Sequence, residues 1–333
     1  MISIGVSSSP YSPIHCIFAI AQSNNNTYVI PNTTIIYTNW GQPIDDNSFI
    51  DIKDSNIEID VAWMSIIENK LYRYSCRLEE NVISNTSHLL IGCALFGKIC
   101  IWSNNYSSSE VILYDQGNCI DDEFDSFFNK EDYKIELVEN ESCNMVELCD
   151  LFHKLLYEEY RIDSFDYIDI DELMKKYSYR YVPVMKEFAN EGLVSRDPLL
   201  NPKFKYIEET LFDGTFDKLR NNRLLNIHVS AIPQKIALYC NIGKTEFIVY
   251  FWFEFDVLSA IFERFYGAHP DTKTDFIIRI DAEQKKYELA LYRQGLKEPQ
   301  IIPEDAYQLL VFKNKFEDYR SDNYNQERGA WIW

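Results

Sequence analysis

Hydrophobic residues alternate with polar ones in two consecutive segments of the chain, residues 57–63 and 72–78. A period of two is typical of a strand with one buried face. Glu68, Asn69 and Lys70 separate the segments, so we expect a β-hairpin that turns there. Its apolar faces then need a covering layer.

Helical periodicity follows in residues 144–160, where an apolar stripe repeats at intervals of three and four: Leu148, Leu151, Phe152, Leu155 and Leu156. Asn144 and Glu147 fit a capping box at the start of this helix. Asp169 with Glu172 predicts a second helix that continues into residues 172–181. Residues 191–202 contain one glycine and two prolines and are predicted to be a connection.

The last third again predicts strands around one helix. Strands are expected at residues 235–240, 245–253, 274–281 and 285–293, and Asp213-Gly214 marks a turn. Asp256 is expected to cap an amphipathic helix that ends before Gly267.

The two halves resemble each other. A shift of 175 residues places Tyr72, Tyr74, Cys76 and Leu78 over Phe247, Val249, Phe251 and Phe253. This favours internal duplication, with chance recurrence of strand-turn-helix units as the alternative. We therefore expect an α+β protein, mainly antiparallel sheets with a few covering helices. Its predicted parts are a β-rich half (1–140), a helical, acidic connector (141–202) and an α+β half (203–333).

The net charge of −20 disfavours nucleic acid and anionic membranes as partners and favours a basic or neutral protein. Two acidic segments are candidate partner-binding sites. Their residues are Asp121, Asp122, Glu123, Asp125, Asp163, Asp166, Asp169 and Asp171. The alternatives for these residues are an ordinary solvated surface or, for the second segment, a metal site.

Motifs that carry chemistry are missing. The chain has no nucleophile elbow, no zinc-protease helix and no dinucleotide-binding glycine pattern, and its five histidines and eight cysteines lack metal-ligand spacing. We expect most of the cysteines to be buried free thiols, which suits a reducing compartment. The prediction is a non-enzyme without cofactor or metal; a hydrolase with a dispersed site stays an alternative.

The apolar run from Ile14 to Ile20 is too short for a signal peptide or a membrane span. No later segment reaches 18 apolar residues. The expected location is cytoplasmic for the chain as written, or periplasmic or outer-membrane tethered if a lipoprotein leader has been removed.

The first half of the chain contains a Trp-Gly pair, a W-x-S-x-x-E-x-x-Y hairpin and a glycine-containing strand that ends in Ile-Trp. The residues of these motifs are Trp40, Gly41, Trp63, Ser65, Glu68, Tyr72, Gly92, Gly97 and Trp102. Together they resemble a family of bacterial envelope proteins of unknown function, some of which are similar to immunity proteins against lipase effectors of type VI secretion. The similarity covers about residues 1–185.

The resemblance implies a binding protein that neutralises a secreted antibacterial toxin, an effector such as a lipase with a basic surface, by forming a tight complex. Trp40, Trp63, Tyr72 and Trp102 are then expected to build the core. One departure is the lack of a lipoprotein leader, since Cys16 follows Ile14 and His15 rather than small residues. A structural or accessory envelope protein is the alternative function.

Overall fold

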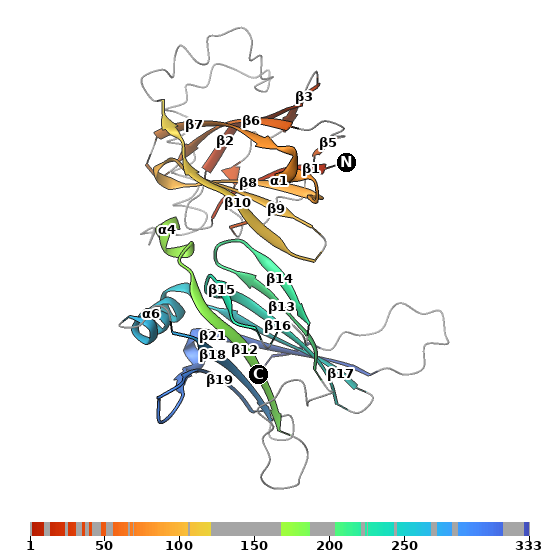
Figure 1. Cartoon of the computed structure of the whole chain (residues 1–333), viewed down its shortest axis with the longest axis vertical. Coiled ribbons are helices and arrows are strands. Elements are labelled where there is room, and N and C mark those ends of the chain that lie inside the picture. The colour runs from red at the N-terminus through yellow and green to blue at the C-terminus, as the bar shows by residue number, and fades with distance from the viewer. Residues whose placement is uncertain are drawn as a thin grey trace, which may run out of the picture. The chain divides into compact units, whose positions relative to one another are not determined.

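The computed structural model divides the chain into two compact units, unit 1 (Met1–Glu172) and unit 2 (Leu173–Trp333). Figure 1 draws unit 1 from red to yellow and unit 2 from green to blue. The structure describes residues 2–9, 14–23, 26–30, 35–36, 40–41, 48–50, 56–65, 67–68, 70–105, 107–120, 168–186, 204–220, 224, 226–242, 245–267, 272–281, 286–315 and 330–332.

Unit 1 consists of two sheets. The first has the strand order β10 (Ser109–Gln116), β9 (Lys98–Asn104), β8 (His88–Cys93), β1 (Ile2–Ser7), β5 (Ser48–Ile50). The second has the order β11 (Asn118–Cys119), β7 (Lys70–Glu79), β6 (Asn56–Ser65), β2 (Ile14–Ser23), β3 (Asn26–Ile30), with β4 (Ile35–Ile36) also pairing with β2. All described pairs are antiparallel except β1 with β8. The short helix α1 (Glu80–Ile83) follows β7.

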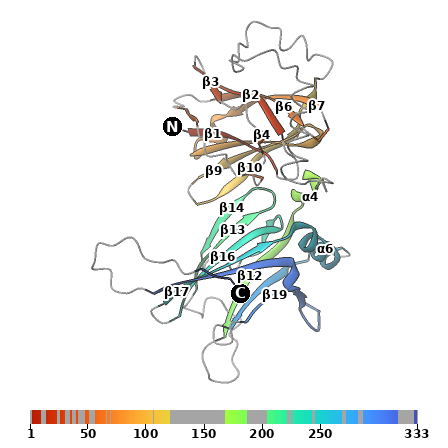
Figure 2. The same ribbon diagram turned by 180° about the vertical axis from the view of Figure 1, so that it is seen from behind.

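Unit 2 also consists of two sheets. The first has the order β15 (His228–Ser230), β12 (Tyr177–Lys186), β18 (Thr274–Asp281), β19 (Lys286–Arg293), β20 (Gln300–Ile302). The second has the order β14 (Phe216–Arg220), β13 (Phe204–Leu211), β16 (Pro233–Ile242), β17 (Thr245–Phe253), β21 (Tyr307–Lys315), β22 (Ala330–Ile332). Helix α6 (Phe255–Tyr266) follows β17, and it lies beside one end of the unit 2 sheets (Figure 1 and Figure 2).

The two units share one topology. In each, the first strand pairs in parallel with the strand that follows the helix, β1 with β8 and β12 with β18. The hairpin β6–β7 corresponds to β16–β17, and a helix follows the hairpin in both units. The predicted shift of 175 residues agrees with this correspondence, because β7 begins at Lys70 and β17 at Thr245.

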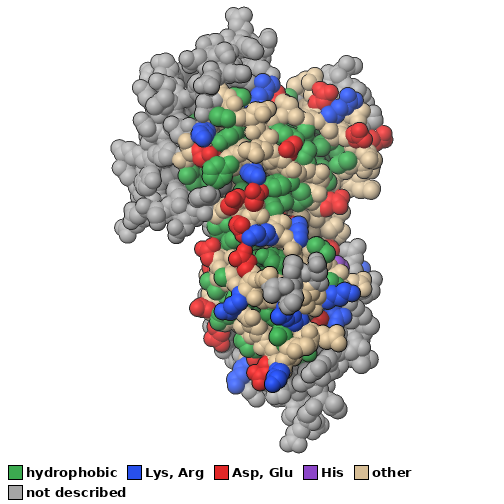
Figure 3. All heavy atoms as spheres, turned by 60° about the vertical axis from the view of Figure 1, so that its left-hand side comes forward, with side chains coloured by type: hydrophobic (Ala, Val, Ile, Leu, Met, Phe, Trp, Pro, Cys, Tyr) green, Lys and Arg blue, Asp and Glu red, His purple; other side chains and the backbone are tan. Residues whose placement is uncertain are grey.

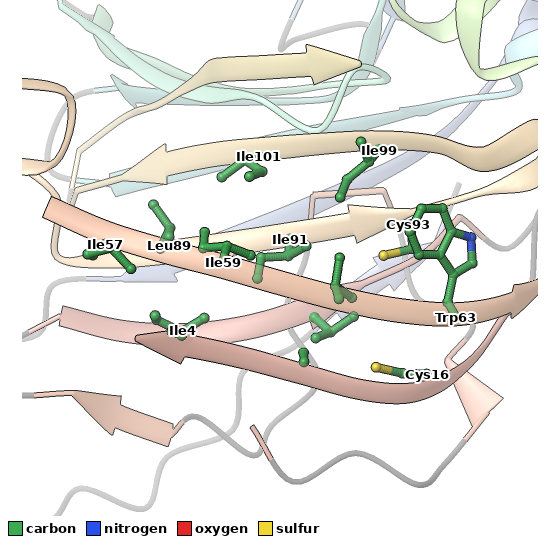
Figure 4. Packing of buried hydrophobic residues seen from close by; sticks show 14 of the residues in the cluster. Ile4, Cys16, Ile57, Ile59, Trp63, Leu89, Ile91, Cys93, Ile99 and Ile101 are labelled. Atoms are coloured by element: carbon green, nitrogen blue, oxygen red, sulfur yellow. The ribbon is translucent and has the colours of Figure 1, made fainter. Parts of the chain in front are cut away.

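The core of unit 1 is aliphatic and lies between its two sheets. Ile4 and Leu89 come from the first sheet, whereas Ile59 and Trp63 come from the second (Figure 4). Each of these side chains is at most 1% exposed. Burial of an aliphatic side chain of this size stabilises a fold by about 1.5–3 kcal/mol, so the predicted alternation of residues 57–63 places its apolar face in this core.

The core of unit 2 contains a cluster of aromatic rings. Phe262 of α6 packs with its ring centroid 5.8 Å from that of Tyr179 on β12 and 6.2 Å from that of Phe276 on β18. Phe253 of β17 lies 6.2 Å from Phe276 and so joins the two sheets. Such edge-to-face pairs add to the area that the rings bury.

The predicted hairpins and the helix near Asp256 are confirmed, but several details were wrong. Asp256 lies in the first turn of α6, and Glu254 occupies the cap position without a side-chain hydrogen bond. Residues 177–181 form part of strand β12 rather than a helix, and helix α4 is limited to Ile170–Leu173. The helical connector was therefore wrong at residues 177–186.

The cause of the error at β12 is its tyrosines. Tyr177, Tyr179 and Tyr181 alternate with Ser178 and Arg180, which is a period of two, and the strand is fixed by pairing with distant β18. The α+β class also overstated the helical content, because the described chain consists mostly of antiparallel sheets with few helices. The predicted helix 144–160 and connection 191–202 lie outside the described residues.

Candidate functional site

The turn between β8 and β9 carries an exposed aromatic side chain in an unfavourable backbone conformation. Phe96 has φ 57° and ψ 25°, and the next residue, Gly97, has φ 70°. Two successive positive φ angles are typical of a type I′ hairpin turn, which prefers Asn, Asp or Gly at its first central position. A side chain in this region costs about 1–2 kcal/mol, yet the Phe96 residue is 41% exposed.

Side chains from the β6–β7 turn and from the end of β10 hold the backbone of Phe96. Its amide donates to Oε2 of Glu68 (2.7 Å), and the hydroxyl of Tyr72 donates to Oε1 of the same carboxylate (2.9 Å). Its carbonyl accepts from Nε2 of Gln116 (2.9 Å), and the amide of Gly117 donates to the carbonyl of Gly97 (2.7 Å). Hydrogen bonds to a charged group are among the stronger ones, so they offset the cost of the turn.

The W-x-S-x-x-E-x-x-Y residues support this turn from below. The rings of Trp63 and Tyr72 are stacked with centroids 5.7 Å apart, and Nε1 of Trp63 donates to the carbonyl of Ala94 (3.1 Å). Glycine is required around the two rings: a Cβ on Gly97 would lie 2.8 Å from Tyr72, and one on Gly117 would lie 2.8 Å from Trp63. Trp63 and Tyr72 are buried at 0% and 5% exposure.

The Trp-Gly motif and the glycine-containing strand meet in a second aromatic contact. Trp40 packs edge-on against Trp102 with centroids 4.9 Å apart, and both are buried. A Cβ on Gly92 would lie 2.4 Å from the ring of Trp102 and 3.0 Å from that of Trp40. Trp40 and Trp102 are thus core residues, and the packing of Trp63 and Tyr72 supports the Phe96 turn.

Two of the predicted partner-binding residues lie within the described chain, and both have intramolecular roles. Asp169 accepts a hydrogen bond from the amide of Asp171 (3.0 Å) at the start of α4. The carboxylate of Asp171 accepts from the hydroxyl of Tyr114 and pairs with Lys98 Nζ (3.1 Å). The hydrogen bond from Tyr114, helped by Lys98, lowers the pKa of Asp171, so this carboxylate is charged and already engaged. Six predicted residues lie outside the described part: Asp121, Asp122, Glu123, Asp125, Asp163 and Asp166.

The net negative charge of the sequence belongs to one unit. Residues 1–172 contain 29 Asp and Glu against nine Lys and Arg, a net charge of −20, whereas residues 173–333 contain 23 of each. Within unit 1, residues 121–167 contain 15 acidic and four basic residues. On the face that Figure 3 shows, the described acidic and basic side chains are interspersed. More than half of the excess charge therefore comes from residues 121–167.

Aromatic side chains cover the outer face of the larger sheet of unit 2. Tyr206 of β13 stacks on Tyr239 of β16 with centroids 4.2 Å apart, and Tyr250 stacks on Trp252 within β17 at 5.3 Å. Nζ of Lys235 lies 5.4 Å from the centroid of Tyr250 and 5.8 Å from that of Trp252, which is close enough for cation–π attraction. All four rings are half-buried.

A carboxyl group is buried in the interior of unit 2. Glu209 of β13 is 6% exposed, and its Oε2 atom makes no hydrogen bond with the described residues. Burial raises the pKa of Glu209 to about 8, and the nearby carboxylates of Asp217 and Asp213 act in the same direction. The Tyr181 hydroxyl opposes this shift in pKa. Glu209 is therefore protonated at neutral pH in the folded protein.

The described cysteines are mostly buried and all are free. Cys16, Cys93, Cys100 and Cys240 are buried, as predicted, whereas Cys76 is half-buried and Cys119 is exposed. Burial raises the pKa of the Cys16 thiol to about 12, which makes it a poor nucleophile.

Among the described residues, no group of three metal-ligating side chains comes together. In the same part of the chain, no helix has both the length and the apolar character needed to cross a bilayer.

Sequence reasoning missed Phe96. The signal was present, because Leu95-Phe96-Gly97-Lys98 lies between two apolar segments, where a hairpin turn is expected. The clamp that Glu68 and Gln116 form depends on residues 28 and 20 positions away, so no local pattern reveals it.

No protein-family model, curated protein or solved structure matches this chain. The resemblance to immunity proteins stays a prediction.

Proposed function

We propose that this chain is an immunity-like binding protein, which neutralises a secreted antibacterial toxin by forming a tight complex and without catalysing a reaction. One observation carries the proposal: unit 1 has the whole net charge of −20, and unit 2 has none. A strongly acidic unit accelerates encounter with a basic protein surface, and the tightness of such a complex comes from a few buried anchors.

Unit 1 is the contact unit in this proposal, and the basic partner is an effector protein such as a lipase. The acidic residues at 121–125 are the first candidates for its contact surface. A rigid scaffold that presents exposed loops is the usual arrangement for recognition, and the packed glycine and tryptophan residues of unit 1 supply such a scaffold.

We further propose that the two units arose by internal duplication. The shared strand order and the equal position of the helix support this origin. Duplication leaves one copy free to acquire a new surface, and the difference in net charge agrees with such a division of roles.

The proposal is tested by co-expressing the full chain with the product of its neighbouring gene. We expect a stable complex and rescue of growth when that product is expressed in the cytoplasm or exported, and the compartment in which rescue occurs locates the function. No complex and no rescue in either compartment would reject immunity for that pair and favour the accessory envelope protein.

A matched pair of charge variants tests the role of unit 1. The variant D121N/D122N/E123Q/D125N removes four negative charges from unit 1, and E254Q/E298Q/E304Q/D305N removes four exposed ones from unit 2. We expect the association rate to fall about tenfold only for the unit 1 variant, and only at low salt, because exposed charges are screened. Equal rates for the two variants would refute steering by unit 1.

A further inference from the structure

The ring of Phe96 is displayed on a backbone that other residues hold in place. The turn ends the hairpin of β8 and β9, both of which pair over their length within the first sheet of unit 1. The amide of Phe96 is held by Glu68 at 2.7 Å and its carbonyl by Gln116 at 2.9 Å. Both backbone polar groups of this residue are therefore fixed before any partner arrives.

Phe96 is also an unusual residue for the first central position of this turn. Asn or Gly would satisfy positive φ at this position with less strain, and Phe96 leaves 41% of its surface exposed. Non-glycine residues held at positive φ cluster at ligand clamps and other functional sites. An aromatic side chain on a rigid turn is also the typical anchor of a protein interface, since little conformational entropy is lost on binding.

One carboxylate contacts the turn, and two more belong to its neighbours. Glu68 contacts Phe96 directly, and Asp115 precedes the Gln116 that holds it. The carboxylate of Asp171 pairs with Nζ of Lys98, which follows Phe96 by two residues. Asp115 also accepts a hydrogen bond from the Tyr74 hydroxyl (2.8 Å). Among these described contacts, three carboxylates accompany the ammonium group of Lys98, so their net charge has the same sign as that of the unit.

We propose that the Phe96 turn is a docking anchor, which inserts its ring into an apolar pocket of a protein partner whose rim carries Lys and Arg. This inference rests on the proposed function and names the surface that performs it. Charge complementarity selects the partner: the acidic unit repels acidic proteins and anionic membranes, while basic side chains around a pocket would be attracted to the carboxylates of Glu68 and Asp115.

The test uses the purified full chain and the purified product of the neighbouring gene. Phe96→Asn removes the ring and keeps a residue that tolerates positive φ. We expect affinity to fall about tenfold or more, mainly through faster dissociation. Val229→Thr is the matched control, because Val229 is a 70% exposed hydrophobic residue of unit 2, and its affinity should equal that of the wild type.

A second measurement, on the free chain, separates docking from folding. Loss of strain in Phe96→Asn should raise the thermal midpoint by about 2–4 °C, whereas a lower midpoint would mean that the ring serves the fold and would overturn the inference. If the wild type binds and Phe96→Asn binds with the same affinity, the Phe96 ring is not an anchor, but the proposed function still holds. Failure of the wild type to bind rejects the proposed function for that pair, and the anchor with it.

Discussion

Units 1 and 2 have the same topology but carry different residues at equivalent positions, both in the core and on the outer faces of their larger sheets. Alignment of their central hairpins places Phe247 at the position of Tyr72, and so Cys240 at the position of Trp63, because each lies opposite the other in its ladder. The same alignment places Glu209 at the position of Ala21. The topology therefore tolerates a tryptophan exchanged for a cysteine and an alanine exchanged for a glutamic acid.

The outer faces of the two larger sheets differ in the same way. Glu58 and Arg77 pair in unit 1, and the equivalent positions in unit 2 are occupied by Lys235 and Trp252. Asp60 and Ser75, which share a hydrogen bond of 2.8 Å, correspond to Ala237 and Tyr250. Ion pairs in one unit are thus replaced by aromatic contacts in the other, which shows that the inward alternation, and not the identity of the outer residues, defines the fold.

The largest effect is expected at the core position that Trp63 occupies in unit 1 and Cys240 in unit 2. Trp63→Ala should lower the free energy of unfolding of unit 1 by about 3–5 kcal/mol, because it empties a fully buried site. Cys240→Ala should cost only about 1 kcal/mol in unit 2, since it removes one small group. Hydrogen exchange of peptides from each unit measures both losses. Equal losses would contradict the expectation that the cost follows the size of the buried side chain.

The buried carboxyl group predicts that unit 2 loses stability as the pH rises from about 4.5 to about 8. Folding raises the pKa of Glu209 to about 8, so the folded state holds a proton that the unfolded state releases near pH 4.5. The stability that the protonated group contributes is complete below that pH and is lost as pH rises through about 8, at about 1.4 kcal/mol per pH unit. The groups that act on Glu209 are Tyr181, Asp217 and Asp213.

Glu209→Gln should remove this dependence, because an amide does not titrate. Denaturant unfolding at pH 5 and pH 7, followed by peptides of unit 2, gives the slope directly. Ala21→Gln in unit 1 is the matched control and should add no slope. If the slope in unit 2 persisted in Glu209→Gln, the titrating group would be another residue.

Much of this comparison could be predicted from the sequence, because strands β6 and β7 alternate, β16 and β17 are continuous apolar segments, and each pair is joined by a polar turn. The position of strand β12 in its sheet could not, since its partner β18 begins 97 residues later, although the alternating tyrosines of β12 do carry the period of a strand. Glu209 escaped notice for another reason: a glutamate in an alternating segment gives no local sign that it faces inward. The clamp on Phe96 likewise depends on residues that are distant in the sequence.

Removal of an ion pair on the outer face of unit 1 should have a smaller effect on stability, and this effect should depend on salt. Asp60 accepts two hydrogen bonds from Arg73, at 2.9 and 2.5 Å, and both side chains are partly exposed. Asp60→Asn should lower the free energy of unfolding by about 1 kcal/mol at low salt and by less at 1 M salt. Denaturant unfolding at the two salt concentrations checks this, and a loss that is equal at both would argue against an ionic contribution.

Lys235→Met should have the smallest effect on stability, and its salt dependence should differ most clearly from that of Asp60→Asn. The substitution keeps the apolar stem over Tyr250 and Trp252 but removes the ammonium group, so unit 2 should lose about 0.5–1 kcal/mol of cation–π attraction. Because a ring face replaces the charged partner of unit 1, this loss should change less with salt than that of Asp60→Asn. Unfolding of the two variants in parallel measures the difference. The same salt dependence in both would mean that Lys235 acts through a carboxylate, and that the outer faces of the two units are stabilised by the same kind of contact.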